Sequence, residues 1–324
     1  MPKSEEWSFS ETMQPSADAV AFDLAAVLDA VVLIRAEVPD DAFTAQTLGT
    51  ERTGNGVVIS ADGVILTIGY LVTEAETVWI TTNHGKVLRG VPLAYDQQTG
   101  FGLVRAIGEL GLPVLTRADP SRARTGDRVY LVGQGGIKHA LKAYLVAKRE
   151  FAGYWEYLLE QSLVVAPAHP HWSGAALVNE AGQLLGVGSL LMQEQVDGKS
   201  VQTNMVVPID LLEPILPSLL ETGQSGLPAR PWLGLFAGDA EEQVVVAGVV
   251  DDGPAEKAGI EEGDLIIEVA GRRVSSLAAF LRAVWALGPA GVKVPLLLAR
   301  DGDLLRTQVD SVDRNDLLRR SSLH

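Results

Sequence analysis

Short apolar runs separated by turn residues dominate the chain from about Ala30 to Val207. The runs are rich in Val, Ile and Leu, with Gly, Asn and Asp between them, which is the pattern of many short β-strands. "GVVISADGVILTI" (56–68) predicts two strands around an Ala-Asp-Gly turn, and "TVWITTNHGKVLRGVPLAY" (77–95) predicts two more around Asn-His-Gly. Further strands are expected at "FGLVRA", "DRVYLVG", "SLVVAP", "GAALVN" and "LLGVGSLLM". Because no long amphipathic helices separate these runs, a barrel or sandwich is favoured over a doubly wound sheet.

Two segments at the edges of this region have a different pattern. The most apolar window, Ala19 to Val38, is interrupted by Asp23, Asp29 and Arg35, and charged residues are costly at the centre of a bilayer. We therefore expect a buried helix and strand there, and no membrane span. The segment "PIDLLEPILPSLLE" (208–221) has Leu and Ile at helical spacing, although Pro214 and Pro217 break the pattern.

A stretch rich in Gly, Ser and Pro, "TGQSGLPARP" (222–231), lacks apolar periodicity and predicts a linker. Beyond it, "VVVAGVV", "DLIIEVAGRRV" and "VPLLLARDG" predict strands, and "SSLAAFLRAVWAL" predicts a helix capped by Ser275 or Ser276. We expect an N-terminal segment, a large β domain, a linker, a small α+β domain and a C-terminal tail. Their expected bounds are 1–19, 20–221, 222–230, 231–315 and 316–324.

The composition excludes several kinds of partner and catalytic site. The 324 residues include 47% hydrophobic residues, 33 Gly and 16 Pro, which suits a turn-rich globular protein. A net charge of -15, from 41 acidic and 26 basic residues, argues against nucleic acid as a partner. The absence of Cys excludes disulfides, thiolate metal sites and cysteine nucleophiles. We expect no cofactor and no metal.

The first residues, "MPKSEEWSFSETMQPSADAV", carry acids where a signal peptide needs a basic start followed by an apolar core. A cytoplasmic location is therefore expected for the chain as written. If a leader has been removed from it, we expect a periplasmic or otherwise exported protein.

Several stretches, taken in order, resemble a known family. "TGNGVVISADGVILTIGYLV", "YDQQTGFGLVRA", "RTGDRVYLVGQ" and "HPHWSGAALVNEAGQLLGV" are similar to the trypsin-like domain of HtrA/Deg serine proteases. "RPWLGLFA", "GPAEKAGIEEGDLIIEVAGRRVSSLAAFLRAV" and "VPLLLARDGDL" look like that family's PDZ domain. The resemblance covers roughly residues 20 to 315. It implies a mainly β fold, a trypsin-like double β-barrel followed by a small α+β PDZ domain.

The resemblance also places the catalytic residues. Family members use a His as base, an Asp that holds the base, and a Ser nucleophile. In "LTIGYLV" Tyr70 stands at the His position, and in "TGFGLV" Gly100 stands at the Asp position. "HPHWSGAAL" keeps Ser173 but has His171 where the family has the Gly whose N–H helps to form the oxyanion hole. This pattern is typical of a pseudoprotease, in which Ser173 is a vestigial nucleophile.

Other interpretations of this region stay open. His169 or His171, or a partner chain, could supply a non-standard base, which would make the chain an active serine endopeptidase. The pair His169-x-His171 could be half of a metal site, but no third ligand is apparent in the sequence, so loop histidines are the default. Trp172 and Tyr70 could fill the catalytic cleft or build a new apolar pocket.

In the PDZ-like part, "PWLGLF" corresponds to the loop whose backbone N–H groups receive a peptide's terminal carboxylate. Gly234 would let the backbone approach that anion closely, with apolar residues around it forming the rest of the groove. The same apolar residues could instead be core only. The residues expected to bind peptide are Trp232, Leu233, Gly234, Leu235, Leu277, Phe280 and Leu281.

The function expected from the resemblance is binding. The partners would be extended peptides or protein C-termini, and the chain would act as an adaptor, a chaperone-like scaffold or a regulator of an active homologous protease. Family members form trimers through N-terminal aromatic residues, so a homo-oligomer is expected. Trp7 and Phe9 could have that role or lie in a flexible tail.

Overall fold

The computed structural model describes residues 7–196 and 198–319. Within them the chain divides into two compact units. Unit 1 comprises residues 7–149 and 161–226, and unit 2 comprises residues 150–160 and 227–319. Parts of two predicted segments, residues 1–6 of the N-terminal segment and 320–324 of the tail, lie outside the described residues. Among the helices described, none is both long enough and apolar enough to cross a membrane.

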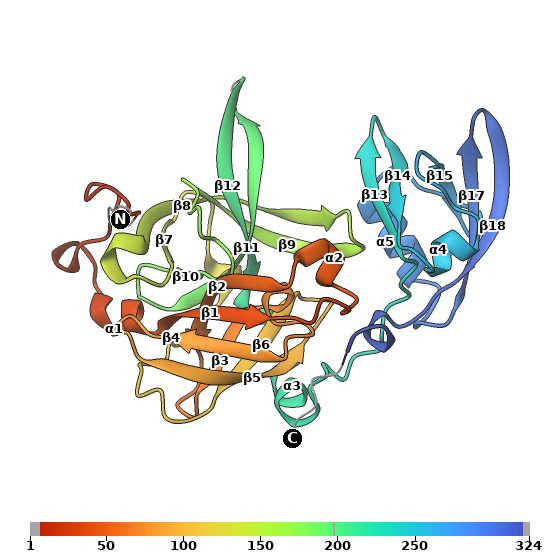
Figure 1. The fold of residues 1–324 in the computed structure, drawn as a ribbon. Coiled ribbons are helices and arrows are strands. Elements are labelled where there is room, and N and C mark those ends of the chain that lie inside the picture. Colours follow the sequence, from red (N-terminus) through yellow and green to blue (C-terminus); the bar gives the residue numbers. More distant parts are fainter. Residues whose placement is uncertain (1–6, 197, 320–324) are drawn as a thin grey trace, which may run out of the picture. The chain divides into compact units, whose positions relative to one another are not determined.

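Two closed barrels form unit 1, and Figure 1 shows their strands. In the first barrel the strand order is β1-β2-β3-β6-β5-β4, and Ile34, Ile65, Ile80 and Val104 are among the buried residues of its core. The predicted strands around the Ala-Asp-Gly turn are confirmed, with Val57 opposite Leu66. The strand bounds are β1 Val31–Glu37, β2 Glu51–Val58, β3 Val64–Ile68, β4 Thr77–Thr81, β5 Val87–Tyr95 and β6 Phe101–Ala106.

The second barrel has the strand order β10-β11-β12-β9-β8-β7. Leu131, Leu145, Leu163 and Leu177 lie in its core. The hairpin of β11 and β12 stands out from the barrel in Figure 1. The strand bounds are β7 Arg128–Val132, β8 Ala140–Gly153, β9 Tyr157–Ala166, β10 Ala176–Val178, β11 Leu184–Val196 and β12 Lys199–Pro208.

Short helices complete unit 1. The helix and strand predicted for residues 19–38 are confirmed as α1 and β1, and α1 begins where the Asp23 side chain accepts a hydrogen bond from the Ala26 N–H. The helix predicted over 208–221 is instead two pieces, η5 and α3, with Pro214 between them because a proline interrupts helical hydrogen bonding. The bounds are η1 Ala17–Ala19, α1 Leu24–Asp29, α2 Ala45–Leu48, η2 Gly69–Leu71, η3 Pro120–Arg122, η4 Gly136–His139, η5 Ile209–Leu211 and α3 Leu216–Thr222.

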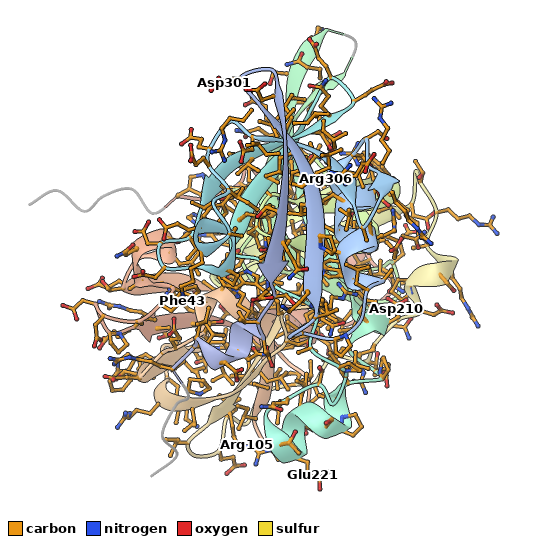
Figure 2. All side chains as sticks on the ribbon, turned by 90° about the vertical axis from the view of Figure 1, so that its right-hand side faces the viewer. Phe43, Arg105, Asp210, Glu221, Asp301 and Arg306 are labelled. Atoms are coloured by element: carbon orange, nitrogen blue, oxygen red, sulfur yellow. The ribbon has the colours of Figure 1, made fainter. Side chains whose placement is uncertain are left out.

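Unit 2 is built on an antiparallel sheet of order β13-β14-β15-β17-β18, with β16 paired to β15. Of the two predicted caps, Ser276 is the one that begins α5, because its side chain accepts from the Ala279 N–H. Figure 2 labels Asp301 in the turn between β17 and β18, and Arg306 on β18. The bounds are β13 Leu235–Ala240, β14 Gln243–Val249, α4 Pro254–Lys257, β15 Leu265–Val269, β16 Arg272–Arg273, α5 Leu277–Trp285, β17 Lys293–Arg300, β18 Asp303–Asp310 and η6 Arg314–Asp316. The predicted fold class, a double β-barrel followed by a small α+β domain, is confirmed.

Candidate functional site

Ser173 lies in the loop between β9 and β10, and contacts from both barrels hold that loop. Asn55 on β2 donates its backbone N–H to the Ser173 carbonyl over 2.7 Å, and its side-chain amide donates to the carbonyls of His171 and Ser173. The Gly174 N–H donates to the Gly188 carbonyl on β11 over 2.8 Å. Gly174 has a φ of 74°, and an added Cβ would meet the Asn55 carbonyl oxygen at 1.8 Å. A Gly is therefore required after Ser173 for this loop to fit.

Tyr70 places its hydroxyl beside Ser173. The phenol oxygen lies 2.8 Å from Ser173 Oγ and 2.8 Å from the Ser189 carbonyl oxygen. Because a phenol has one hydrogen and a carbonyl only accepts, all three atoms are satisfied when Tyr70 donates to Ser189 and Ser173 donates to Tyr70. Although part of Tyr70 is exposed, burial of its hydroxyl end raises the pKa of Tyr70 to about 12, with hydrogen bonds to Ser173 and Trp172 acting in the opposite direction.

Gly54 on β2 packs closely on the other side of Ser173. An added Cβ at Gly54 would lie 2.5 Å from Leu71 Cδ1, 2.8 Å from the Ser173 carbonyl oxygen and 3.0 Å from Ser173 Oγ. The Tyr70 hydroxyl and the backbone of β2 at Gly54 thus both lie close to the serine hydroxyl. The structure therefore brings together two residues that the sequence singled out, Ser173 and Tyr70.

His171 gives its backbone N–H to a neighbouring side chain. That N–H donates to His169 Nδ1 over 3.0 Å. Since Nδ1 accepts, the His169 proton sits on Nε2, which lies 3.0 Å from the His139 carbonyl oxygen. His169 is buried, and burial lowers the pKa of His169 to about 4. His169 is therefore a neutral residue that holds the loop, and both of its ring nitrogens are engaged away from Ser173.

The His171 ring lies among other aromatic rings at the surface of unit 1. It is exposed, and its centroid is 5.0 Å from the Trp7 ring. Phe9 is buried, with its ring centroid 4.9 Å from that of His169 and its N–H donating to the Lys138 carbonyl. The two N-terminal aromatic residues thus pack on unit 1. In the part of the chain that the structure describes, no group of three or more His, Asp or Glu residues is arranged to hold a metal ion.

Gly100 lies in a turn, where both its N–H and its carbonyl form backbone hydrogen bonds. Its φ is 81°, its carbonyl accepts from the Gly69 N–H over 2.7 Å, and its N–H donates to the Asp96 carbonyl. An added Cβ at Gly69 would lie 2.1 Å from the ring of Tyr95. The buried Asp96 side chain accepts from the Thr99 N–H and hydroxyl, and so closes the same turn.

An ionic network that the sequence analysis missed holds the segment carrying Tyr70. Arg52 is buried on β2 and donates to the Tyr70 carbonyl over 2.9 Å and to the Thr73 carbonyl over 3.0 Å. Glu74, also buried, accepts from the Thr44 N–H and hydroxyl. Burial lowers the pKa of Arg52, while the Glu74 charge acts in the opposite direction. The adjacent "TE" in "LVTEAE" gave no local signal for this network, because its partners are distant in sequence.

A second candidate site lies in unit 2, at the loop that precedes β13. The backbone N–H groups of Leu233, Gly234 and Leu235 all donate to the carboxylate of Glu156, over 3.0, 2.8 and 3.2 Å. Gly234 has a φ of 75°, which turns the loop toward the anion. Glu156 is buried, and burial raises its pKa to about 7, although the three N–H groups and Arg314 favour the ionised form.

The residues predicted to bind peptide lie around this loop. Trp232 is buried, and its N–H donates to the Val312 carbonyl over 3.1 Å. The apolar members belong to one buried cluster that also contains Leu158; they are Leu233, Leu235, Leu277, Phe280 and Leu281. Their role in peptide binding stays a prediction. Sequence reasoning missed Glu156, although a single acid within the aromatic run "YWEY" is a signal that a buried partner is needed.

Two family descriptions match this chain. Residues 54–187 match the family described as trypsin-like peptidase domain, and residues 231–310 match the PDZ domain. The first match includes Ser173 and runs from β2 to the start of β11, and the second covers the sheet of unit 2.

Curated relatives match more than three quarters of this chain. The chain is 26% identical over 275 residues to the periplasmic serine endoprotease DegP of Escherichia coli K12, covering 79% of this chain and 56% of that protein. It is 28% identical over 265 residues to a probable DegP-like endoprotease of Pseudomonas fluorescens, covering 78% and 54%. The chain thus spans about half the length of the curated relatives it matches.

Solved structures have a similar fold over most of the chain. The serine endoprotease from Yersinia pestis is 25% identical, with a TM-score of 0.52, covering 90% of this chain and 95% of that one. The HtrA-type protease AlgW with a decapeptide is 22% identical, with a TM-score of 0.53, covering 92% and 99%. The likeness to AlgW shows the fold alone.

Proposed function

We infer that this chain, a homologue of the HtrA-family proteases with a trypsin-like domain and a PDZ domain, does not cleave peptides at Ser173 and acts by binding extended peptides or protein C-termini. The observation that carries this proposal is the Tyr70 hydroxyl, 2.8 Å from Ser173 Oγ where the family resemblance places the base. At a pKa of about 12, roughly one Tyr70 in 10⁵ is a phenolate at pH 7. Tyr70 is therefore protonated when a base is needed.

Two further features support an inactive centre. Gly100 has no carboxylate at the position that would orient a base, and the loss of such a group costs on the order of 10⁴ in rate. The His171 N–H, which would help to stabilise an oxyanion, instead donates to His169 Nδ1. The site thus differs from an active protease at three positions: that of the base, that of the acid that orients it, and that of the oxyanion donor.

An active serine endopeptidase is the alternative. One observation favours it: the His171 ring is exposed and lies two residues from Ser173. For that ring to act as base, the loop clamped by Asn55 would have to rearrange, since Asn55 holds the His171 carbonyl over 2.9 Å. A base from a partner chain would have to displace Tyr70 from Ser173.

The binding half of the proposal rests on unit 2. Three N–H groups of the loop before β13 converge on one carboxylate, which is the chemistry needed to hold a peptide's C-terminus. The solved AlgW structure contains a decapeptide, which is a property of that protein and consistent with this assignment. A chaperone-like scaffold, or a regulator of an active homologous protease, would use the same loop.

A fluorophosphonate probe tests whether Ser173 is a nucleophile. We expect the probe to leave the full chain unlabelled at pH 7 to 8, while an active HtrA-family protease is labelled in parallel. Ser173→Ala serves as the matched variant. Labelling of the unaltered chain that disappears in Ser173→Ala would establish the endopeptidase alternative.

A further inference from the structure

The loop expected to receive a peptide's carboxylate already binds one from its own chain. Glu156, at the tip of the β8–β9 hairpin, accepts from the Leu233 N–H with both of its oxygens, over 3.1 and 3.0 Å. Its Oε1 also accepts from the N–H groups of Gly234 and Leu235. A glutamate side chain ends in the same group as a peptide chain, so Glu156 fills the site with the chemistry of a C-terminus.

The backbone of the hairpin tip adds a second ligand-like contact. The Tyr154 carbonyl accepts from the Ala237 N–H of β13 over 3.0 Å. An extended peptide that adds as a strand to a sheet edge bonds through its carbonyl groups in this way. Tyr154 thus occupies an N–H of β13, and Glu156 occupies the N–H groups of the carboxylate loop. A bound peptide would use both.

Other contacts hold the tip in place. Arg282 on α5 forms ion pairs with Glu150 and Glu160, one on each side of the tip. Leu158 is buried in the core cluster of unit 2, and the Tyr154 ring lies 5.9 Å from the Phe236 ring. The tip is therefore part of the folded unit.

Glu156 also adopts an uncommon backbone conformation. Its φ is 61°, a left-handed value that few residues with a Cβ adopt. This conformation is retained while the carboxylate accepts hydrogen bonds from the loop. Loss of those bonds would remove the interaction that holds Glu156 in this conformation, so the contact is suited to exchange with a competing ligand.

We propose that Glu156 is an internal substitute for a peptide C-terminus, which closes the PDZ carboxylate site until a peptide with a free terminal carboxylate displaces it. The proposal rests on the peptide-binding function proposed above and adds its regulation. Three N–H groups cannot hold two carboxylates at once, and two anions at one loop repel each other. Peptide and hairpin tip are therefore mutually exclusive.

The closed state lowers the apparent affinity for peptides. A ligand that binds a minor open state has its dissociation constant raised by the reciprocal of the open fraction. If the tip is docked in about 99% of molecules, removal of Glu156 improves binding about a hundredfold. An improvement of tenfold or more is expected for any docked fraction above about 90%.

A binding titration with the full chain tests whether Glu156 competes with peptides for the carboxylate loop. The probe is a pool of fluorescent decapeptides with randomised last four residues and a free C-terminal carboxylate, compared with the same pool as C-terminal amides. The variants are Glu156→Gln and Glu156→Ala, and the control is Glu262→Gln, which removes an exposed acid of unit 2. We expect both Glu156 variants to bind the carboxylate pool at least tenfold more tightly than the unaltered chain, and Glu262→Gln to match the unaltered chain.

The outcomes separate the two proposals. If the carboxylate pool binds the unaltered chain and both Glu156 variants equally, peptide binding stands and displacement of Glu156 is wrong. If neither pool binds to any of these chains, the peptide-binding function itself is wrong, and its regulation with it. If both pools bind equally well, recognition of a terminal carboxylate is wrong, and displacement of Glu156 by that group is wrong as well.

Hydrogen exchange on the unaltered chain provides a measurement that does not depend on a variant folding. At saturating carboxylate pool, we expect the amides of residues 150–160 to exchange faster, while those of Leu233 to Leu235 stay protected. Unchanged exchange in residues 150–160, with peptide bound at the loop, would overturn the displacement.

Discussion

A serine hydroxyl, a phenol and a carbonyl share one part-buried arrangement at Ser173. Arg52 holds the backbone at and after Tyr70, because it donates to the carbonyls of Tyr70 and Thr73. Gly54 and Leu71 leave little space beside the hydroxyl. The Tyr70 hydroxyl thus fills the space beside Ser173 Oγ, where a base would have to act.

Tyr70→Phe removes the phenol oxygen from this arrangement. Ser173 Oγ and the Ser189 carbonyl each lose a partner, so we expect the free energy of unfolding of unit 1 to fall by about 1–2 kcal/mol. Urea unfolding measures this change. Tyr144→Phe, which removes an exposed hydroxyl on β8, should change stability by no more than a few tenths of a kcal/mol. Equal stability of the two variants would contradict the role assigned to Tyr70.

His169 makes the stability of unit 1 depend on pH. Burial holds the pKa of His169 at about 4, below the ordinary 6.5 of the unfolded chain. As pH falls through 6.5 the unfolded chain takes up a proton that the folded chain does not, so stability is lost between pH 6.5 and 4. The total loss from this group is about 3 kcal/mol.

Unfolding at a series of pH values, compared with His169→Gln, checks this prediction. The variant should be less stable at pH 7.5, because the contacts of the ring are lost. It should also lose less stability than the unaltered chain on going to pH 5. Parallel pH profiles of the two proteins would show that His169 does not carry the dependence.

At the scale of elements, the sequence predicted those strands in which apolar residues form runs or alternate. β2, β3, β4 and β6 have buried residues at most or alternate positions, and the sequence predicted them. β8 and β18 were missed. β18 has exposed side chains at most positions, and no residue from Ala147 to Ala152 of β8 is buried. A strand that extends beyond a core has no apolar period to reveal it.

The assignment of Ser276 as the cap of α5 can be tested by substitution. The side chain of Ser276 caps the helix by accepting from the Ala279 N–H over 3.2 Å. We expect Ser276→Ala to lower the free energy of unfolding of unit 2 by about 1 kcal/mol. Ser275→Ala, one residue earlier, should leave it within a few tenths of a kcal/mol. The same loss in both variants would mean that the cap is assigned to the wrong serine.

At the scale of the whole molecule, what the sequence could predict depended on whether function lies in local motifs. The roles predicted for the positions of Tyr70, Gly100 and Ser173 rest on stretches that resemble a family, since each position is marked by its neighbours. The hydrogen bond between Tyr70 and Ser173 joins residues 103 positions apart, and that of Glu156 to Leu233 spans 77. Contacts of this kind arise from tertiary folding, so the sequence around one residue does not identify its partner.

The central claim is that the chain binds unfolded protein without cleaving it. Native mass spectrometry of the full chain, incubated with an unfolded protein substrate that has a free C-terminus, tests this most directly. We predict complexes of the chain with intact substrate and no fragments after prolonged incubation. Substrate fragments that appear with the unaltered chain and disappear with Ser173→Ala would contradict the account.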